Sequence, residues 1–135
     1  MTDPRAPCLI GVGQRTWHPD EVGEAGAPEP LDMWEDVARR AADDSGVGAG
    51  ALEQLDTLDI VYCQTWQYDD PPGRLAARLG ADPTRRYYSG IGGTTPQVLV
   101  QDTAARIQRG ECDLALVGGA EALATQRRDK QRGAR

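Results

Sequence analysis

The segment from Ser89 to Pro96 has the residue types that place chemistry at the head of a helix. Its sequence, SGIGGTTP, joins a predicted strand at 86–89 to a predicted helix from Pro96 to about Arg109. The first N–H groups of a helix have no partner within the helix, so such a junction can hold an anion or lower the pKa of a nucleophile. A tight turn that needs glycine for steric reasons explains the same residues, and both interpretations stay open.

The other side chains with catalytic or metal-binding potential are scattered along the chain. The three cysteines, Cys8, Cys63 and Cys112, form no C-x-x-C pair, and His18 is the only histidine. A structural zinc site needs four ligands in short-range pairs, so no metal site is predicted. His18 fits a surface position in a loop better than a site.

Apolar runs and helix signals predict alternating strands and helices. The predicted strands are 8–13, 55–63, 86–89 and 114–117, and the predicted helices are 30–46, 73–79 and 96–109. The order β-α-β-α-β-α-β, with continuous apolar strands, predicts an α/β fold whose layers surround a mixed, largely parallel sheet. In such folds the chemistry gathers where strand ends face helix N-termini.

The first predicted strand ends in Gly11-Val12-Gly13. This pattern resembles the start of a dinucleotide fingerprint. Thr16 stands where the third glycine belongs, however, and no helix follows directly, so no nucleotide cofactor is predicted.

Residue spacing also predicts which helix faces are buried. In the helix from Pro30 the apolar positions are Leu31, Trp34, Val37, Ala38 and Ala41. In the helix from Pro96 they are Val98, Val100, Ala104 and Ile107.

Composition and charge exclude several classes of protein. The chain has 135 residues, which fit one domain, and no apolar run approaches the roughly 20 residues of a membrane span. The first residues lack the pattern of a secretory signal. A net charge of -6 argues against a nucleic-acid partner, and widely spaced cysteines indicate a reducing cytoplasm. We therefore expect a cytoplasmic protein that binds neither membrane nor nucleic acid.

Two stretches resemble a known family. They are residues 88–97, YSGIGGTTPQ, and residues 109–121, RGECDLALVGGAE. With the order of elements, the opening LIGVGQ and the helix from Pro30, they resemble thiolases, and in particular sterol-carrier-type, thiolase-like acetyl-CoA acetyltransferases of high-GC bacteria. The resemblance runs from residue 8 to about 128. It implies a layered α/β/α half-domain of the thiolase fold and a family activity on acyl-CoA thioesters in lipid or sterol metabolism, with acyl-CoA as substrate and no further cofactor.

The sequence departs from this family at the catalytic positions. In thiolases the acyl-accepting cysteine precedes the helix, and counting back from Gly110 places that position at Gly93, which has no side chain to acylate. Cys112 lies at the far end of the helix and cannot replace it. Thiolases also need a second cysteine and a histidine from a later half, and nothing after Gly119 resembles those motifs. No catalytic residue is therefore predicted, and we expect the chain alone to be inactive.

The resemblance implies two sets of contact residues. The turn before the helix would hold the thioester, and the strand before that turn would join two copies in a dimer. These residues are, in that order, Gly92, Gly93, Thr94 and Thr95, and then Tyr87, Tyr88 and Ser89.

The resemblance also sets the expected division of the chain and its partners. We expect residues 1–124 to be a truncated thiolase-like N-terminal segment and residues 125–135 a basic tail. The expected partner is a second copy or a complementing C-terminal half. Three other roles stay open. The first is a subunit of an acyl-CoA carbon–carbon lyase, since some proteins with the thiolase fold lack the nucleophile, act as such lyases and pair with a small OB-fold protein. The second is a non-catalytic binding subunit, and the third is a truncated product without an independent role.

Overall fold

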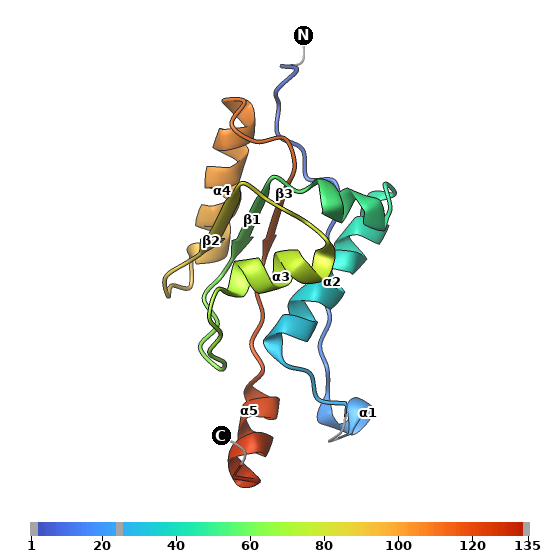
Figure 1. Cartoon of the computed structure of the whole chain (residues 1–135), viewed down its shortest axis with the longest axis vertical. Coiled ribbons are helices and arrows are strands. Elements are labelled where there is room, and N and C mark those ends of the chain that lie inside the picture. The colour runs from blue at the N-terminus through green and yellow to red at the C-terminus, as the bar shows by residue number, and fades with distance from the viewer. Residues whose placement is uncertain (1–2, 24–25, 134–135) are drawn as a thin grey trace.

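The structure is a computed structural model that describes residues 3–23 and 26–133. The described residues form a small parallel sheet with helices on both faces (Figure 1). The elements in chain order are α1 (Pro19–Val22), α2 (Pro30–Ser45), the 3-10 helix η1 (Ala49–Gln54), β1 (Thr57–Ile60), α3 (Pro71–Leu79), β2 (Arg85–Tyr88), α4 (Thr95–Gln108), β3 (Ala115–Gly118) and α5 (Leu123–Gln131).

The sheet has the order β2-β1-β3, and both strand pairs are parallel. In register, Leu58 of β1 lies opposite Arg86 of β2 and Leu116 of β3. All four residues of the central strand β1 are buried, as expected for a strand covered on both faces. The predicted layered α/β fold with a largely parallel sheet is confirmed, and every strand pair described is parallel.

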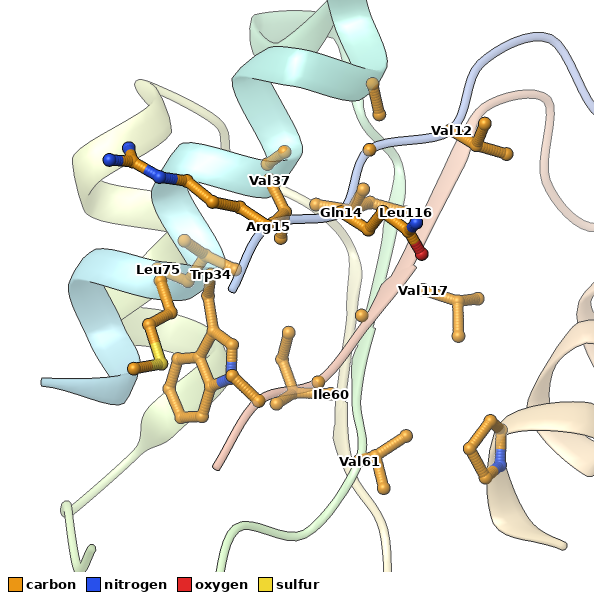
Figure 2. Close-up of a pocket in the computed structure, with 18 of the residues that line it drawn as sticks. Val12, Gln14, Arg15, Trp34, Val37, Ile60, Val61, Leu75, Leu116 and Val117 are labelled. Carbon is orange, nitrogen blue, oxygen red and sulfur yellow. The ribbon is translucent and has the colours of Figure 1, made fainter. Parts of the chain in front are cut away.

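One face of the sheet packs against α2 and α3 and forms the apolar core. Leu58 and Ile60 point to this face and are fully buried, together with Leu75 of α3. Trp34 of α2 is 1% exposed and lies next to Ile60 (Figure 2). Because side chains alternate along a strand, the neighbours of Leu58 in sequence face the opposite layer.

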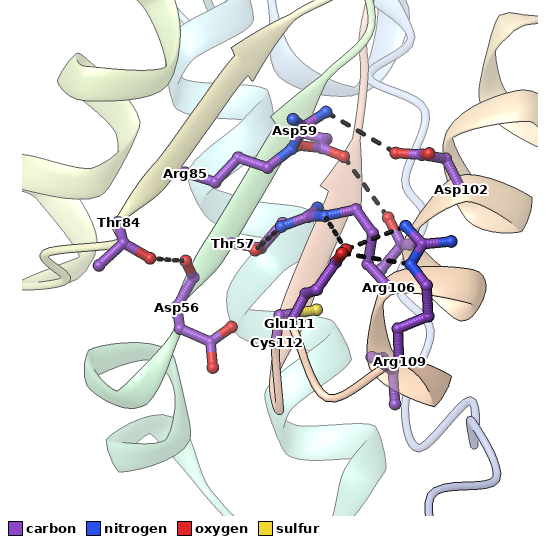
Figure 3. Close-up of polar contacts among 12 residues, drawn as sticks. Asp56, Thr57, Asp59, Thr84, Arg85, Asp102, Arg106, Arg109, Glu111 and Cys112 are labelled. Atoms are coloured by element: carbon purple, nitrogen blue, oxygen red, sulfur yellow. Dashed lines mark hydrogen bonds and ion pairs between the residues drawn. The ribbon is translucent and has the colours of Figure 1, made fainter.

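The opposite face of β1 carries a polar layer beneath α4 (Figure 3). The Thr103 hydroxyl donates to Asp59 Oδ2 at 3.4 Å, and Arg106 donates to the Thr57 hydroxyl at 3.0 Å. Arg85 of β2 lies 3.5 Å from Asp59 Oδ1. Burial raises the pKa of Asp59, and the charges of Arg85 and Arg106 oppose this effect. The layer between sheet and α4 is therefore held by hydrogen bonds and charge as well as by apolar contact.

Capping residues explain where the helices begin and end. The Glu29 and Asp32 side chains form a capping box at the start of α2, and Gly46 ends this helix in the left-handed conformation with φ 78°. Asp70 caps α3 by accepting from the Gly73 N–H at 3.2 Å, and Gly80 ends it with φ 70°. These boundaries confirm the helix ends that proline and glycine predict.

The predicted strand at 8–13 is wrong as an element, because this segment pairs with no strand in the described part of the chain. It runs against α2 instead. A Cβ on Gly11 would lie 2.1 Å from the Ala41 carbonyl oxygen, and one on Gly13 would lie 2.4 Å from the Val37 carbonyl oxygen. Only glycine allows so close an approach to the helix backbone. The apolar side chains between and before these glycines are left largely exposed.

The predicted buried face of α4 is also partly wrong. Val98 and Val100 are each 53% exposed, whereas Leu99 and Thr103 are buried against the sheet. The sheet offers this helix the polar side chain of Asp59, so Thr103 fits the contact better than an aliphatic residue does.

The last described residues form a helix and not only a solvated tail. Residues 123–131 form α5, and Thr125 is 2% exposed, with its hydroxyl donating to the Pro28 carbonyl at 2.7 Å. The division of the chain after residue 124 stays a prediction.

Candidate functional site

The carboxyl ends of the three parallel strands share one edge of the sheet, where α/β proteins bind ligands. Three loops leave this edge, at 61–65 after β1, at 89–95 between β2 and α4, and at 119–122 after β3. The junction predicted to bind substrate is the second of these. Hydrogen bonds tie the first loop to each of the other two.

Tyr88 of β2 and the following residue, Ser89, hydrogen-bond to the loop after β1. The Tyr62 N–H donates to Ser89 Oγ at 2.9 Å, and Ser89 Oγ donates to the Gly90 carbonyl at 2.9 Å. The Cys63 N–H donates to the Tyr88 hydroxyl oxygen at 2.8 Å. Two of the three residues predicted to join copies, Tyr88 and Ser89, are therefore engaged within the chain, and Ser89 is buried.

Hydrogen bonds to Glu121 link the loop after β3 to the loop after β1. Its carboxylate accepts from the backbone N–H groups of Gln64 at 2.8 Å and Thr65 at 3.0 Å, and from the Thr65 hydroxyl at 2.6 Å. The Cys63 thiol donates to the same carboxylate at 3.5 Å. Burial acts to raise the pKa of Glu121, but these hydrogen bonds outweigh it and the pKa is lowered. A charged carboxylate thus holds the loops together at neutral pH.

The turn before α4 is open. Residues 92, 93 and 94 are exposed, and the Thr95 N–H donates to the Gly92 carbonyl at 3.2 Å. Thr94 precedes the first residue of α4, and its side chain makes no capping hydrogen bond. The positive end of this helix is therefore free of a side-chain cap, which favours an anionic group at this position.

Gly93 has a backbone that does not require glycine. It does not have a positive φ, and a Cβ built on it meets no atom within 4 Å. A tight turn that needs glycine for steric reasons therefore does not explain residue 93. At Gly92 a Cβ would lie 2.9 Å from Thr95 Oγ1, so that position is more restricted.

The structure brings no cysteine to this turn. Cys63 is fully buried, and its burial raises the pKa of the thiol, which keeps it protonated. Cys112 is buried beyond the far end of α4, and Cys8 is exposed on the extended N-terminal segment. His18 is exposed at the start of α1. None of these four side chains belongs to the turn at 92–95, and the one cysteine in the loop beside it, Cys63, is buried and protonated.

The role of Glu121 was not predicted from the sequence. Its only signal in the sequence is its position, since it follows the glycine pair that closes the last predicted strand, where the carboxyl edge of a parallel sheet lies.

Residues 3–23 and 26–133 contain no group of three side chains that could hold a metal ion. None of the helices among them is long and apolar enough to cross a membrane.

Comparison with known proteins identifies the class of fold. No protein-family profile matches the sequence, and no curated protein matches it. Among solved structures, a monomeric SCP2-thiolase-like protein type 1 from Mycobacterium smegmatis superposes with a TM-score of 0.76 and 28% sequence identity over 90% of this chain. The chain spans 24% of the length of that protein.

The chain therefore has a thiolase-like fold of the sterol-carrier type. The resemblance drawn from its motifs is confirmed at the level of fold, over nearly the whole sequence.

Proposed function

We propose that the chain is a thiolase-like module that binds acyl-CoA thioesters at the turn before α4 without forming an acyl-enzyme. In this proposal it acts with a complementing polypeptide in lipid or sterol metabolism in the cytoplasm. The observation that carries the proposal is Gly93, which stands where the thiolase resemblance places the acyl-accepting cysteine and has a backbone that would accept a side chain. The missing thiol is therefore not a consequence of a crowded turn.

The open helix end supports binding of an anionic thioester. Thr94 gives the N-terminus of α4 no side-chain cap, but the Thr95 N–H already donates to the Gly92 carbonyl and Pro96 has no N–H, so an anion would interact with the helix dipole and the Gln97 N–H. The loop before this helix is held at its start by Ser89, so the turn is ordered before a ligand arrives. A pre-organised turn binds without a large cost in ordering the loop.

The same observation favours a second candidate, a subunit of an acyl-CoA carbon–carbon lyase. Breaking a carbon–carbon bond by a retro-aldol route needs a base and a stabilised enolate, but no thiol that accepts the acyl group. A glycine at position 93 is compatible with that chemistry and incompatible with acyl transfer through residue 93.

Two assays on the purified chain test the proposal. Acetoacetyl-CoA and CoA should give no thiolytic turnover, and a rate of even ~1 s⁻¹, an ordinary enzyme rate, would contradict it. Calorimetric titration with acetoacetyl-CoA should show binding that Gly93→Asp weakens, because the new carboxylate would occupy the end of α4. Gly50→Asp is the charge-matched control, since a Cβ at residue 50 also meets no atom within 4 Å. Equal binding by both variants would refute the assigned turn.

A further inference from the structure

Asp59 places a carboxylate in the central strand of the sheet, where charged side chains are rare. Its exposed fraction is 0%, and no other acidic residue is buried in the part of the chain that the structure describes. Moving a charge out of water costs free energy, so a buried carboxylate stays charged only with suitable partners. The groups around Asp59 therefore decide its charge.

Charged and titratable groups face Asp59 from the elements that pack around it (Figure 3). β2 contributes Arg85 and Tyr87, and α4 contributes Asp102 and Arg106. The residue opposite Asp59 on β3 is a valine, which carries no charge. Burial raises the pKa of Asp59, the two arginines oppose this effect, and the negative charge of Asp102 adds to it. The arginines therefore do not outweigh burial.

Arg85 lies between two carboxylates. Its Nε is 3.5 Å from Asp59 Oδ1, and its Nη2 is 3.7 Å from Asp102 Oδ2. Among the described residues, neither Arg85 Nε nor Asp59 Oδ1 has a hydrogen-bond partner, so the contact between them is an ion pair without hydrogen-bond geometry. The Asp102 side chain is about half exposed, whereas Asp59 is buried. Arg85 thus has an inner and an outer partner at nearly the same distance.

Arg106 has partners that do not depend on Asp59. Its side chain is 11% exposed, it donates to the Thr57 hydroxyl at 3.0 Å, and its Nε lies 3.9 Å from Glu111 Oε2. The hydrogen bond from Arg109 lowers the pKa of Glu111, so this outer carboxylate remains charged in mildly acidic solution. Arg106 therefore keeps a counter-ion when Asp59 loses its charge.

We propose that Asp59 and Arg85 form a proton-linked switch beneath α4. When Asp59 is ionised, Arg85 is shared between Asp59 and Asp102. When Asp59 takes up a proton from solvent, Arg85 turns to Asp102, its remaining charged partner, and joins β2 to α4 at the surface. The neutral Asp59 carboxyl keeps its contact with the Thr103 hydroxyl, because either group can then donate the hydrogen bond.

Protonation of Asp59 strengthens the attachment of α4 to the sheet. A carboxyl whose pKa is raised by folding binds its proton more tightly in the folded chain, so its ionised form disfavours the fold. This cost is absent below the ordinary pKa of 3.8 and is fully present above the raised pKa of the folded chain. The attachment of α4 therefore becomes firmer as pH falls through the raised value. Because α4 begins at the turn of the proposed thioester site, the switch also regulates that turn, and this last step alone rests on the proposed function.

NMR titration of the chain between about pH 3 and about pH 8 tests the proposal. The side-chain carboxyl carbon of Asp59 should titrate with a midpoint above 3.8, and the Arg85 Nε resonance should shift with the same midpoint. Asp59→Asn keeps the shape of the protonated carboxyl, so its Arg85 resonance should lack this midpoint. Asp36→Asn is the matched control, because Asp36 pairs with Arg40 on α2, across the sheet, and its loss should leave both midpoints unchanged.

Amide exchange measures the attachment of α4. The protection of its amides, corrected for the intrinsic effect of pH on exchange, should rise as pH falls through the midpoint of Asp59. The rise should be up to about tenfold for each pH unit by which that midpoint exceeds 3.8. In Asp59→Asn the protection should not change with pH over this range, and at neutral pH it should equal or exceed that of the wild-type chain.

Three outcomes would overturn the proposal. The first is a midpoint of Asp59 at or below 3.8, which would mean that the arginines outweigh burial. The second is an Arg85 resonance that does not follow Asp59. The third is a loss of α4 protection in Asp59→Asn at neutral pH, as expected when one member of a fixed buried ion pair is removed.

The titration of the wild-type chain needs no variant, so it decides the proposal even where Asp59→Asn does not fold. None of these measurements uses a thioester. A failure to bind acetoacetyl-CoA would therefore contradict the proposed function and leave the switch standing.

Discussion

Replacing Gly93 with cysteine puts a thiol where the thiolase resemblance places the acyl-accepting residue. The structure predicts that the variant folds, because the new Cβ meets no atom within 4 Å and the backbone is not left-handed. Replacing a glycine whose conformation another residue can adopt restricts mainly the unfolded chain. We therefore expect the free energy of unfolding to stay constant or to rise by up to about 1 kcal/mol.

The position of this thiol beside the uncapped end of α4 sets the size of the chemical effect. A helix N-terminus stabilises a nearby negative charge by roughly 0.3–1 kcal/mol, so the thiolate fraction below the pKa rises about two- to fivefold. The nucleophilicity of a thiolate falls with its pKa, with a Brønsted slope of about 0.5. The net gain in alkylation rate at pH 7 is then only about 1.3- to 2.3-fold, and the midpoint of the pH–rate profile is the sharper readout.

The assay is alkylation with iodoacetamide across pH, in a Cys8→Ser background because Cys8 is exposed. The matched control is Ile91→Cys. Residue 91 lies in the same loop, is 70% exposed and is two residues farther than Gly93 from the N-terminus of α4. The thiol of Gly93→Cys should have the lower pKa of the two. An equal or higher midpoint for Gly93→Cys would refute the placement of residue 93 at the end of α4.

Three further predictions concern other parts of the chain. Glu121→Gln should lower the free energy of unfolding by roughly 1–2 kcal/mol at pH 7. Because folding lowers the pKa of Glu121, its stabilisation is present above its ordinary value of 4.5 and is lost as pH falls through the folded value. Urea unfolding should show the two proteins converging at acidic pH, and a constant difference would contradict this assignment. Gly11→Ala should lower the free energy of unfolding by about 1–3 kcal/mol, because its Cβ would lie 2.1 Å from the Ala41 carbonyl oxygen. Gly90→Ala is the control and should leave the free energy of unfolding unchanged, because its Cβ would meet no atom within 4 Å. Equal unfolding midpoints for the two variants would contradict the close packing of Gly11 on α2. If two copies associate through β2, Tyr87→Asp should weaken the dimer, because Tyr87 is 39% exposed on that strand. Sedimentation of both proteins measures this effect. A single wild-type species near 14.6 kDa over a hundredfold range of concentration would contradict the dimer.

The features that the sequence predicts well depend on local chemistry. Gly46 and Gly80 end their helices because each adopts a positive φ that other residues avoid, and this preference is visible in the sequence. The buried strand β1 is predictable for a similar reason, since a short apolar run with β-branched residues fits a strand covered on both faces.

The features that could not be predicted from the sequence depend on the tertiary packing of each segment. The segment at 8–13 has the composition of a strand, but pairing requires a neighbour, and none of the described strands lies beside it. The periodicity of α4 identifies its apolar positions but not their partner, so it could not show that Val100 faces a cleft while Thr103 contacts Asp59. Glu121 joins loops that lie 56 residues apart in sequence, a contact that no local pattern indicates.

The intact mass of the protein after incubation with acetoacetyl-CoA tests the central claim most directly. A thiolase that uses its first cysteine forms an acyl-enzyme on that residue, and the adduct raises the intact mass of the chain. With Gly93 at this position and Cys63 buried with a raised pKa, the account predicts an unmodified chain at neutral pH. A stoichiometric acetyl adduct on the wild-type chain, mapped to any of its three cysteines, would contradict it.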